Sequence, residues 1–502
     1  MKNQRKAGVV LAYLSIGVNM LIQLIYTPVM LRLLGQSEYG VYQIVISAVG
    51  YLGLLNFGFT GAYVRFFEKY RAAGEEKEIE RLNGLFLIIM LVLGAFCFGA
   101  GMVLADGLGF FFGSKLCSEE LLLAKKLTRI LVLNMSLTFP FGLFDCYMVA
   151  LERFRVQKLV LLLKTVSNPF LALPLLFSGY GSVGMVWVTA LLTIAAGGFQ
   201  VIYCLGGLKL RFCFTGLRLG MLREIWVFCF YIFLNQVVDQ VNWSVDKVLL
   251  GALMGTGIVA VYAVAGMFNS IYMQFSTAIS NVFLPRVNRM AAEHADDRAF
   301  TELFTRVGRL QFMVLGLVLS GFVFFGRAFI GFYAGEGYEE AYDIALFLLV
   351  PVTIPLIQNL GIELQRAKNL HRFRSLLYLA AALANVAVSV PLIRVFGGTG
   401  AAMGTMLSLV ICNVLIMNLY YQKVIGLDMK FFWCRIGKLV LAMLPAFLGG
   451  FVIVRVLPVE RIAYFLPGMI LYSVLYGGSV YLFGMKDEER NLIKGLGRRG
   501  KG

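Results

Sequence analysis

Long runs of apolar residues recur along the chain from its first residues almost to its last. Most runs hold about 20 residues, the length that an α-helix needs to cross the hydrocarbon core of a bilayer. The pattern predicts an all-α polytopic membrane protein with about fourteen transmembrane helices. The predicted spans are approximately 9–34, 40–64, 84–106, 127–150, 159–178, 183–205, 224–253, 258–284, 307–333, 341–365, 375–396, 401–424, 438–457 and 462–484.

One predicted span differs from the others because polar side chains run through its middle, within residues 226–251. At helical spacing these side chains form two adjacent stripes. The first stripe consists of Asn235, Asp239, Asn242 and Asp246, and the second of Gln236, Gln240, Trp243 and Lys247. A charge at the centre of a bilayer costs at least ~2.5 kcal/mol on insertion scales. We therefore expect these side chains to face protein or water, with the other helices arranged around them.

Polar residues in other predicted spans each have two interpretations. The further candidates for a functional site are Asn19, Gln23, Asn56, Arg65, Asp145, Lys164 and Glu363. A single Asn or Gln in a membrane helix often serves only to hydrogen-bond a neighbouring helix. Asp145 lies near a predicted helix end, where water can reach it, and Lys164 is close enough to an end to snorkel. Asp239 lies near the middle of its span, where an ion pair with Lys247 or Lys164 is the alternative to a functional role.

The distribution of charge indicates a membrane topology and argues against nucleic-acid binding. The 502 residues are 59% hydrophobic and 15% charged, with a net charge of +17. Of the 45 Lys and Arg residues, 34 lie in alternate connections and at the two chain ends. This positive-inside pattern predicts a multi-pass protein of the cytoplasmic membrane with both termini in the cytoplasm. The basic connections are expected to contact anionic membrane lipids.

Similar fragments at nearly constant offsets indicate an internal duplication. Arg65 and Arg286 open similar connections 221 residues apart, and the region of Pro174 resembles that of Pro391 at an offset of 217. Such offsets predict parallel repeats of six spans, related by an axis along the membrane normal. We expect two pseudo-symmetric six-helix lobes around a central cleft, followed by two extra helices and a basic cytoplasmic tail. The predicted parts are residues 1–215, 216–425 and 426–502.

Residues 27–76 carry three features in a fixed order. These are a Leu-Gly-x-x-x-Tyr-Gly-x-Tyr turn, an Asn56-Phe57-Gly58 break and a closing Arg65-x-x-x-Lys69-Tyr70. In these features, and over about residues 5–425, the chain resembles the polysaccharide flippases of the multidrug/oligosaccharidyl-lipid/polysaccharide exporter superfamily. The first helix lacks the basic cluster associated with the lipid II branch, so the resemblance favours exporters of the capsule, exopolysaccharide or O-antigen type.

The resemblance implies that the chain moves a polyprenyl-diphosphate-linked oligosaccharide from the inner to the outer leaflet by alternating access. The candidates for pairing with the diphosphate are Lys247, Lys164 and Arg65. The candidates for hydrogen bonding or stacking with sugars are Asn19, Gln23, Asn56, Asn235, Gln240, Asn242 and Trp243. The candidates for coupling a Na⁺ or H⁺ gradient to transport are Asp239, Asp246, Glu363 and Asp145. Other proteins of polysaccharide assembly are further candidate partners.

Two other functions are weighed against a flippase. A cation-coupled multidrug exporter of the same superfamily usually has about twelve spans, so the two extra helices count against it. A membrane-embedded polymerase or glycosyltransferase usually carries catalytic groups on a large outer loop. The longest predicted outer connection, residues 107–126, has no such constellation, and no GxxxxGK[ST] motif is present. We therefore expect a transporter that is not an enzyme. The cysteines and histidines have no metal-ligand spacing, so no metal or other cofactor is expected.

Overall fold

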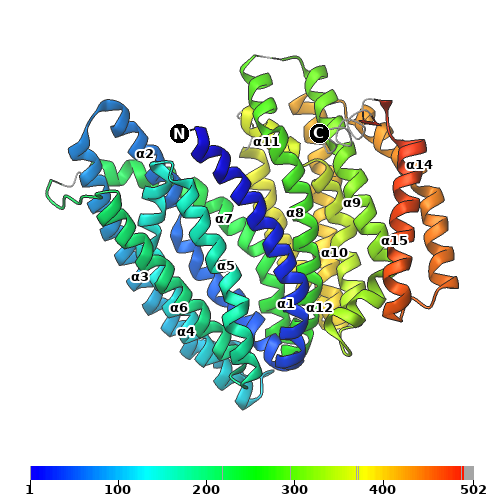
Figure 1. Cartoon of the computed structure of the whole chain (residues 1–502), viewed down its shortest axis with the longest axis horizontal. Helices are drawn as coiled ribbons and strands as arrows, with labels where there is room; N and C mark the ends of the chain where they lie inside the picture. Colours follow the sequence, from blue (N-terminus) through cyan, green and yellow to red (C-terminus); the bar gives the residue numbers. More distant parts are fainter. Residues whose placement is uncertain are drawn as a thin grey trace. The chain divides into compact units, whose positions relative to one another are not determined.

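The computed structural model describes residues 2–216, 219–293, 295–368, 370, 372–487 and 489–490. Helices make up almost all of this part, and no β-strand occurs within it (Figure 1). The predicted all-α fold is confirmed. The chain divides into two compact units, Met1–Ala263 and Val264–Gly502.

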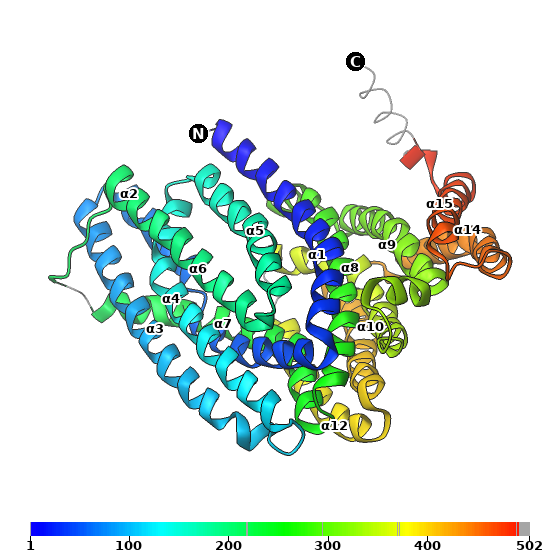
Figure 2. The same ribbon diagram turned by 60° about the horizontal axis from the view of Figure 1, so that its bottom comes forward.

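Long helices form the first unit, because its apolar runs can satisfy their backbone groups in a bilayer only through intrahelical hydrogen bonds. They are α1 (Lys2–Gly50), α2 (Phe59–Ala73), α3 (Glu76–Phe112), α4 (Ser118–Ala150), α5 (Phe154–Phe177), α6 (Gly181–Ile202), α7 (Leu219–Leu253) and the first turns of α8 (Thr256–Ala292). Figure 2 shows α3, α4, α6 and α5 side by side, and each packs on the next in that order. The 3-10 turn η1 (Tyr51–Asn56) connects α1 to α2.

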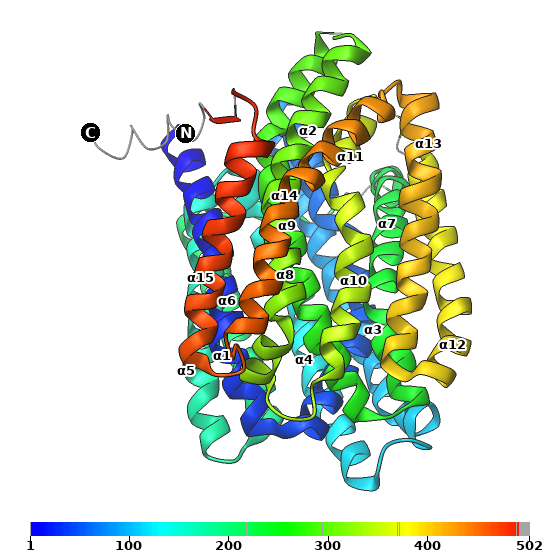
Figure 3. The ribbon, with the colours of Figure 1, turned by 90° about the vertical axis from the view of Figure 1, so that its right-hand side faces the viewer.

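The second unit contains the rest of α8 and the later helices. They are α9 (Asp297–Ala334), α10 (Glu340–Ile357), α11 (Leu360–Ala367), α12 (Arg372–Leu409), α13 (Asn418–Tyr420), α14 (Met429–Val456) and α15 (Ile462–Ser479). The π-helical segments η3 (Val410–Met417), η4 (Tyr421–Ile425) and η5 (Val480–Gly484) continue α12, α13 and α15. Figure 3 shows α14 and α15 alongside α9, and both pack directly on it.

Among the described residues, 11 helices are long and apolar enough to cross a membrane. Two of them, residues 17–73 and 373–425, each cover two predicted spans. The number of fourteen stays a prediction, because side chains of α7 lie partly outside the described structure. The expected long outer connection, residues 107–126, is wrong: α3 continues to Phe112 and α4 begins at Ser118, so only a short turn remains. The apolar signal ends before the helices do, because helices can extend beyond the bilayer.

Glycines with left-handed backbone recur at matching places in the two halves of the chain. Gly35 breaks α1 with φ 72°, and Gly255 separates α7 from α8 with φ 97°, at an offset of 220 residues. Gly181 (φ 56°) and Gly397 (φ 59°) form a second pair, at an offset of 216. Only glycine adopts this conformation without steric cost. The offsets agree with those of the predicted repeat, whose boundaries stay a prediction.

Close packing joins the two last helices to α9. A Cβ atom on Gly316 of α9 would lie 2.6 Å from the Tyr476 hydroxyl of α15, and one on Gly450 of α14 would lie 2.6 Å from the Phe324 ring of α9. The glycines therefore leave the space that the aromatic rings fill. Neighbouring aromatic rings continue this packing, and the ring centroids of Phe325 and Tyr472 are 5.9 Å apart.

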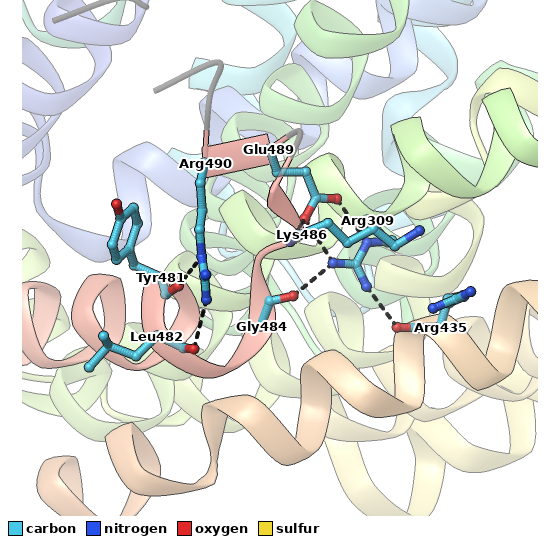
Figure 4. A network of polar contacts seen from close by, with 8 residues as sticks. All are labelled: Arg309, Arg435, Tyr481, Leu482, Gly484, Lys486, Glu489 and Arg490. Atoms are coloured by element: carbon cyan, nitrogen blue, oxygen red, sulfur yellow. Dashed lines mark hydrogen bonds and ion pairs between the residues drawn. The ribbon is translucent and has the colours of Figure 1, made fainter. Parts of the chain in front are cut away.

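A buried ion pair holds Glu489, which follows α15 in the sequence, against α9 (Figure 4). The Arg309 guanidinium of α9 donates from Nε to Glu489 Oε1 (2.9 Å) and from Nη2 to Glu489 Oε2 (2.8 Å). It also donates to the carbonyl oxygens of Arg435 (3.2 Å) and Gly484 (2.8 Å). Arg309 and Glu489 are only 3% and 5% exposed. A buried charge is tolerated when it is paired and hydrogen-bonded. These contacts therefore explain how the arginine side chain of α9 can be buried.

Candidate functional site

The polar residues of α7 lie next to α1 and the start of α8, within the first unit. Of the predicted stripe residues, the structure describes the side chains of Gln236, Gln240, Asn242, Asp246 and Lys247. Three further predicted residues lie on the α7 backbone, but their side chains are outside the described part of the structure: Asn235, Asp239 and Trp243. The site is therefore built from the C-terminal half of α7.

Asp246 is a buried carboxylate on α7, with 4% of its surface exposed. The hydroxyl of Tyr262, on α8, donates a hydrogen bond to its Oδ2 at 2.6 Å. The short turn between α7 and α8 brings these two residues together, because it reverses the chain within a few residues of each. A carboxylate in such surroundings is suited to hold a proton or a small cation, because burial in a membrane protein disfavours the charged form of the group.

Lys247 follows Asp246 in the sequence and points to a different neighbour, because consecutive residues on a helix are rotated by about 100°. Its Nζ donates to Oε1 of Gln43, on α1, at 3.2 Å. No carboxylate pairs with Lys247 among the side chains that the structure describes. An ammonium group has three N–H donors, so a neutral amide leaves it able to bind an anion. Gln43 was not a predicted site residue, because nothing in its own spacing relates it to α7.

The remaining predicted polar residues of α1, α2, α7 and η1 differ in their surroundings. Gln240 donates from Nε2 to Ser244 Oγ at 3.0 Å, and a Cβ atom on Gly50 would lie 3.0 Å from the same amide nitrogen. Gln240 therefore lies against the end of the α1 helix. Asn242 on α7, Gln23 on α1 and Asn56 in η1 are half-buried, whereas Asn19 on α1 and Arg65 on α2 are exposed.

A second polar group connects α5 and α6. Lys164 donates from Nζ to Thr193 Oγ1 at 2.9 Å, and Asn168 donates from Nδ2 to Thr189 Oγ1 at 3.0 Å. Thr189 and Thr193 are four residues apart on α6, as Lys164 and Asn168 are on α5, so the two helices match in register. The i,i+4 spacing of the threonines was a signal that the sequence analysis missed. Like Lys247, Lys164 has a neutral partner and no ion pair among the described side chains.

Two predicted carboxylates are satisfied by nearby donors. Asp145 of α4 accepts from Gln157 Nε2 at 2.9 Å and from Gln200 Nε2 at 3.4 Å, so it is bound by amides of α5 and α6. Glu363 belongs to α11 in the second unit, where Arg366 Nη1 donates to its Oε1 at 2.8 Å. A same-helix pair therefore accounts for the charge of Glu363.

The described residues include no group of three or more His, Cys, Asp or Glu side chains that could hold a metal ion. Both histidines, His294 and His371, lie outside this part. The arrangement on α1, α7 and α8 instead presents one buried carboxylate beside one lysine, each hydrogen-bonded to a neutral side chain. It is suited to bind a ligand anion through Lys247 and a proton or cation through Asp246.

Comparisons with known proteins extend this description. A family model described as "Polysaccharide biosynthesis protein" matches residues 6–291. The solved structure of the lipid II flippase MurJ in an inward closed conformation is similar, with a TM-score of 0.72 and 16% identity, covering 95% of this chain and 99% of that one. No curated protein matches the chain in sequence.

Multidrug exporters have the same fold over less of the chain. An inward-facing MATE family transporter of the MOP superfamily has a TM-score of 0.64 and 14% identity, covering 83% of this chain and 98% of that one. The bent form of the MATE transporter VcmN from Vibrio cholerae has a TM-score of 0.56 and 14% identity, covering 85% and 98%. At these identities the likeness is one of fold.

Proposed function

The chain belongs to the polysaccharide biosynthesis protein family, and we propose that it flips a lipid-linked oligosaccharide across the cytoplasmic membrane. It is a multi-pass membrane protein with the fold of flippases and transporters of the MOP superfamily. The proposed substrate is a polyprenyl-diphosphate sugar unit, moved from the inner to the outer leaflet by alternating access, with both termini of the chain in the cytoplasm. Moving its hydroxyls and phosphates through hydrocarbon unaided would strip them of water at a large free-energy cost.

The observation that carries this proposal is the pair of lysines inside membrane helices with neutral partners, Lys247 on Gln43 and Lys164 on Thr193. Each ammonium group can pair with a phosphate oxygen while its amide or hydroxyl partner keeps it in place. The exposed Arg65 is a third candidate for pairing with the phosphates, and it lies at the side of the membrane predicted to be cytoplasmic. The sugars would be bound by amide side chains, for which the half-buried Gln240, Asn242, Gln23 and Asn56 are the candidates.

Carboxylates provide the proposed coupling to an ion gradient. Asp246 supports this role best, because it is buried and hydrogen-bonded to the neutral Tyr262 hydroxyl. Binding of H⁺ or Na⁺ at Asp246 would change the net charge beside Lys247, and would therefore change the affinity of the site for an anionic substrate. Asp239, Asp145 and Glu363 are further candidates for this role.

A multidrug exporter is the second candidate, favoured by the fold shared with the MATE transporters. The lysines argue against it, because an ammonium group repels the cationic compounds that such an exporter would carry. A substrate with a diphosphate instead gains charge-assisted hydrogen bonds from the same groups.

Replacing Lys247 with Met tests the proposal in a strain that lacks the chromosomal copy. Met keeps the length and apolar stem of the side chain but removes the charge, so we expect surface polysaccharide to fall at least about tenfold, the loss expected from one charge-assisted contact. Lipid-linked sugar units should accumulate and be identified by mass. Lys247→Arg should retain part of the function.

The matched control is Lys115→Met, because Lys115 is an exposed lysine in the α3–α4 turn. This variant should make normal amounts of polymer at an equal level of membrane-inserted protein. Normal polymer in both Lys247→Met and Lys164→Met would contradict the proposed role of the lysines. Accumulation of a small cationic compound in the deletion strain, without trapped lipid-linked sugar, would favour the multidrug exporter.

A further inference from the structure

Three elements of the first unit meet at one carboxylate, Glu120, in the first turn of α4. Ser37, in the turn of α1, donates from Oγ to Glu120 Oε1 at 2.5 Å. Thr256, the first residue of α8, donates from Oγ1 to the same oxygen at 2.7 Å. The backbone N–H of Cys117 donates to Oε2 at 2.9 Å. Glu120 therefore connects the turn of α1, the start of α4 and the α7–α8 turn.

Next to this carboxylate, α1 is in unusually close contact with the end of α7 and the start of α8. A Cβ atom on Gly40 would lie 2.1 Å from the backbone oxygen of Thr256, and one on Gly251 would lie 2.7 Å from the Ile44 side chain. The next contact in this direction is the hydrogen bond between Lys247 and Gln43. These three contacts form a continuous seam, which runs from Glu120 to the charged residues of α7.

The seam begins at the end of the unit that the positive-inside pattern predicts to be extracytoplasmic. The turn of α1, the α3–α4 turn and the α7–α8 turn all lie there. Water or substrate outside the cell can reach Lys247 and Asp246 along the α1–α7 contact only if the seam separates. Only small residues at Gly40 and Gly251 allow the helices to approach so closely, so the seam is closed in this structure.

We propose that Glu120 is a reversible latch that keeps the seam closed on the outer side and releases when the site opens outward. This inference rests on the proposed function. The contact is suited to reversal because the hydrogen bond between Ser37 and Glu120 lies at an exposed edge, where water can replace the Ser37 hydroxyl. The Thr256 hydroxyl is buried, so it leaves Glu120 only when the α7–α8 turn moves away. The neighbouring Glu38 differs, since it accepts from the backbone N–H and the hydroxyl of Ser182, at 2.6 Å each, and Ser182 is fully buried. Glu38 therefore caps α6 and has no such role.

The test measures access to the seam from outside the cell. A cysteine replaces Ser47, which is buried on α1 one turn beyond Gln43, in a background with Cys117→Ser. A membrane-impermeant maleimide is added to intact cells and the labelling rate at residue 47 is recorded. Glu120→Ala should raise this rate by about tenfold, since it removes hydrogen bonds to a charged group from the closed state alone. Thr256→Val should raise it less, because it removes one donor.

Glu119→Gln is the matched control, because Glu119 is the adjacent exposed glutamate and should leave the rate unchanged. Gly40→Ala is a second, independent variant, which should raise the rate by forcing the Thr256 backbone away from α1. An unchanged rate in both Glu120→Ala and Gly40→Ala, at normal membrane levels, would overturn the latch. The labelling needs no substrate, so a fast rate in Glu120→Ala alongside normal polymer in both Lys247→Met and Lys164→Met would retain the latch and reject the proposed substrate site.

Discussion

At the scale of single residues, the charged side chains inside the described helices have two kinds of partner. Arg309 donates four hydrogen bonds, two of them to the oxygens of Glu489. Lys247 and Lys164 have neutral partners. A charge that is fully paired inside a protein holds structure together, whereas one with a neutral partner keeps the capacity to bind a ligand. The two kinds of site therefore call for different measurements.

Replacing Glu489 with Gln should destabilise the second unit by about 3 kcal/mol, because it leaves the Arg309 charge buried without its counter-charge. Thermal unfolding in detergent micelles would measure the loss. Asp487→Asn is the control: Asp487 also pairs with an arginine, Arg490, but its side chain is 94% exposed, and exposed pairs contribute little. Equal melting temperatures for Glu489→Gln and the unaltered protein would show that the ion pair is not needed for stability.

The same pair makes a prediction about pH. Burial alone would raise the pKa of Glu489, but the hydrogen bonds and charge of Arg309 hold it below its usual value. A carboxyl whose folded pKa is lowered adds stability above the pKa of the unfolded chain, and this is lost as the pH falls through the folded pKa. Acidification below about pH 4 should therefore destabilise the unaltered protein more steeply than Glu489→Gln.

At the scale of helices, the apolar and polar periods predicted the existence of most elements and located the polar stripe of α7. They could not predict the partners of that stripe. Gln43 on α1 meets Lys247 through a contact between helices, which leaves no period in the sequence of either helix. Thr193 on α6 does belong to an i,i+4 pair with Thr189, but that spacing does not say which helix the pair faces. The C-terminal end of α3 and the start of α4 were also not predicted. Gly109, Gly113 and Lys115 resemble a loop in the sequence, although α3 continues through Gly109.

Two glycines of α9 give a matched test of helix packing. Gly316→Ala should destabilise the contact between α9 and α15 by ~1–3 kcal/mol, because the added methyl group would overlap the Tyr476 hydroxyl. Gly321→Ala on the same helix should be neutral or slightly stabilising, because no atom lies within 4 Å of the added group and Ala favours helix over Gly. Thermal unfolding of both variants would measure the difference. A similar loss in both would mean that helix flexibility, and not packing, determines the effect.

At the scale of the whole chain, the distribution of basic residues predicts which connections face each side of the membrane. The duplication and the lobe boundaries stay predictions, although the left-handed glycines recur at similar offsets. The resemblance was confirmed at two levels: the family match shows a polysaccharide biosynthesis protein, and the fold is that of the MurJ and MATE structures. The polar residues of the spans did not by themselves identify the substrate, because residues that bind sugars and residues that only join helices are of the same polar types.

Topology can be checked with two single cysteines in a background without the exposed native ones. A cysteine at Lys115, in the α3–α4 turn, should react with an impermeant maleimide added outside intact cells. A cysteine at Lys77, at the start of α3, should react only after the membrane is permeabilised. Both positions are exposed, so a difference in labelling reports the side of the membrane. The opposite result would invert the predicted orientation.

The ion pair that closes the second unit also has a consequence for biogenesis. Arg309 and Glu489 are 180 residues apart, so the ribosome delivers α9 to the membrane long before it has made the counter-charge of its arginine. The charge must be sheltered meanwhile, by water, lipid head groups or an insertion factor. A chain that stops short of Glu489 retains all the apolar helices that the structure describes, but Arg309 of α9 would then lack its counter-charge.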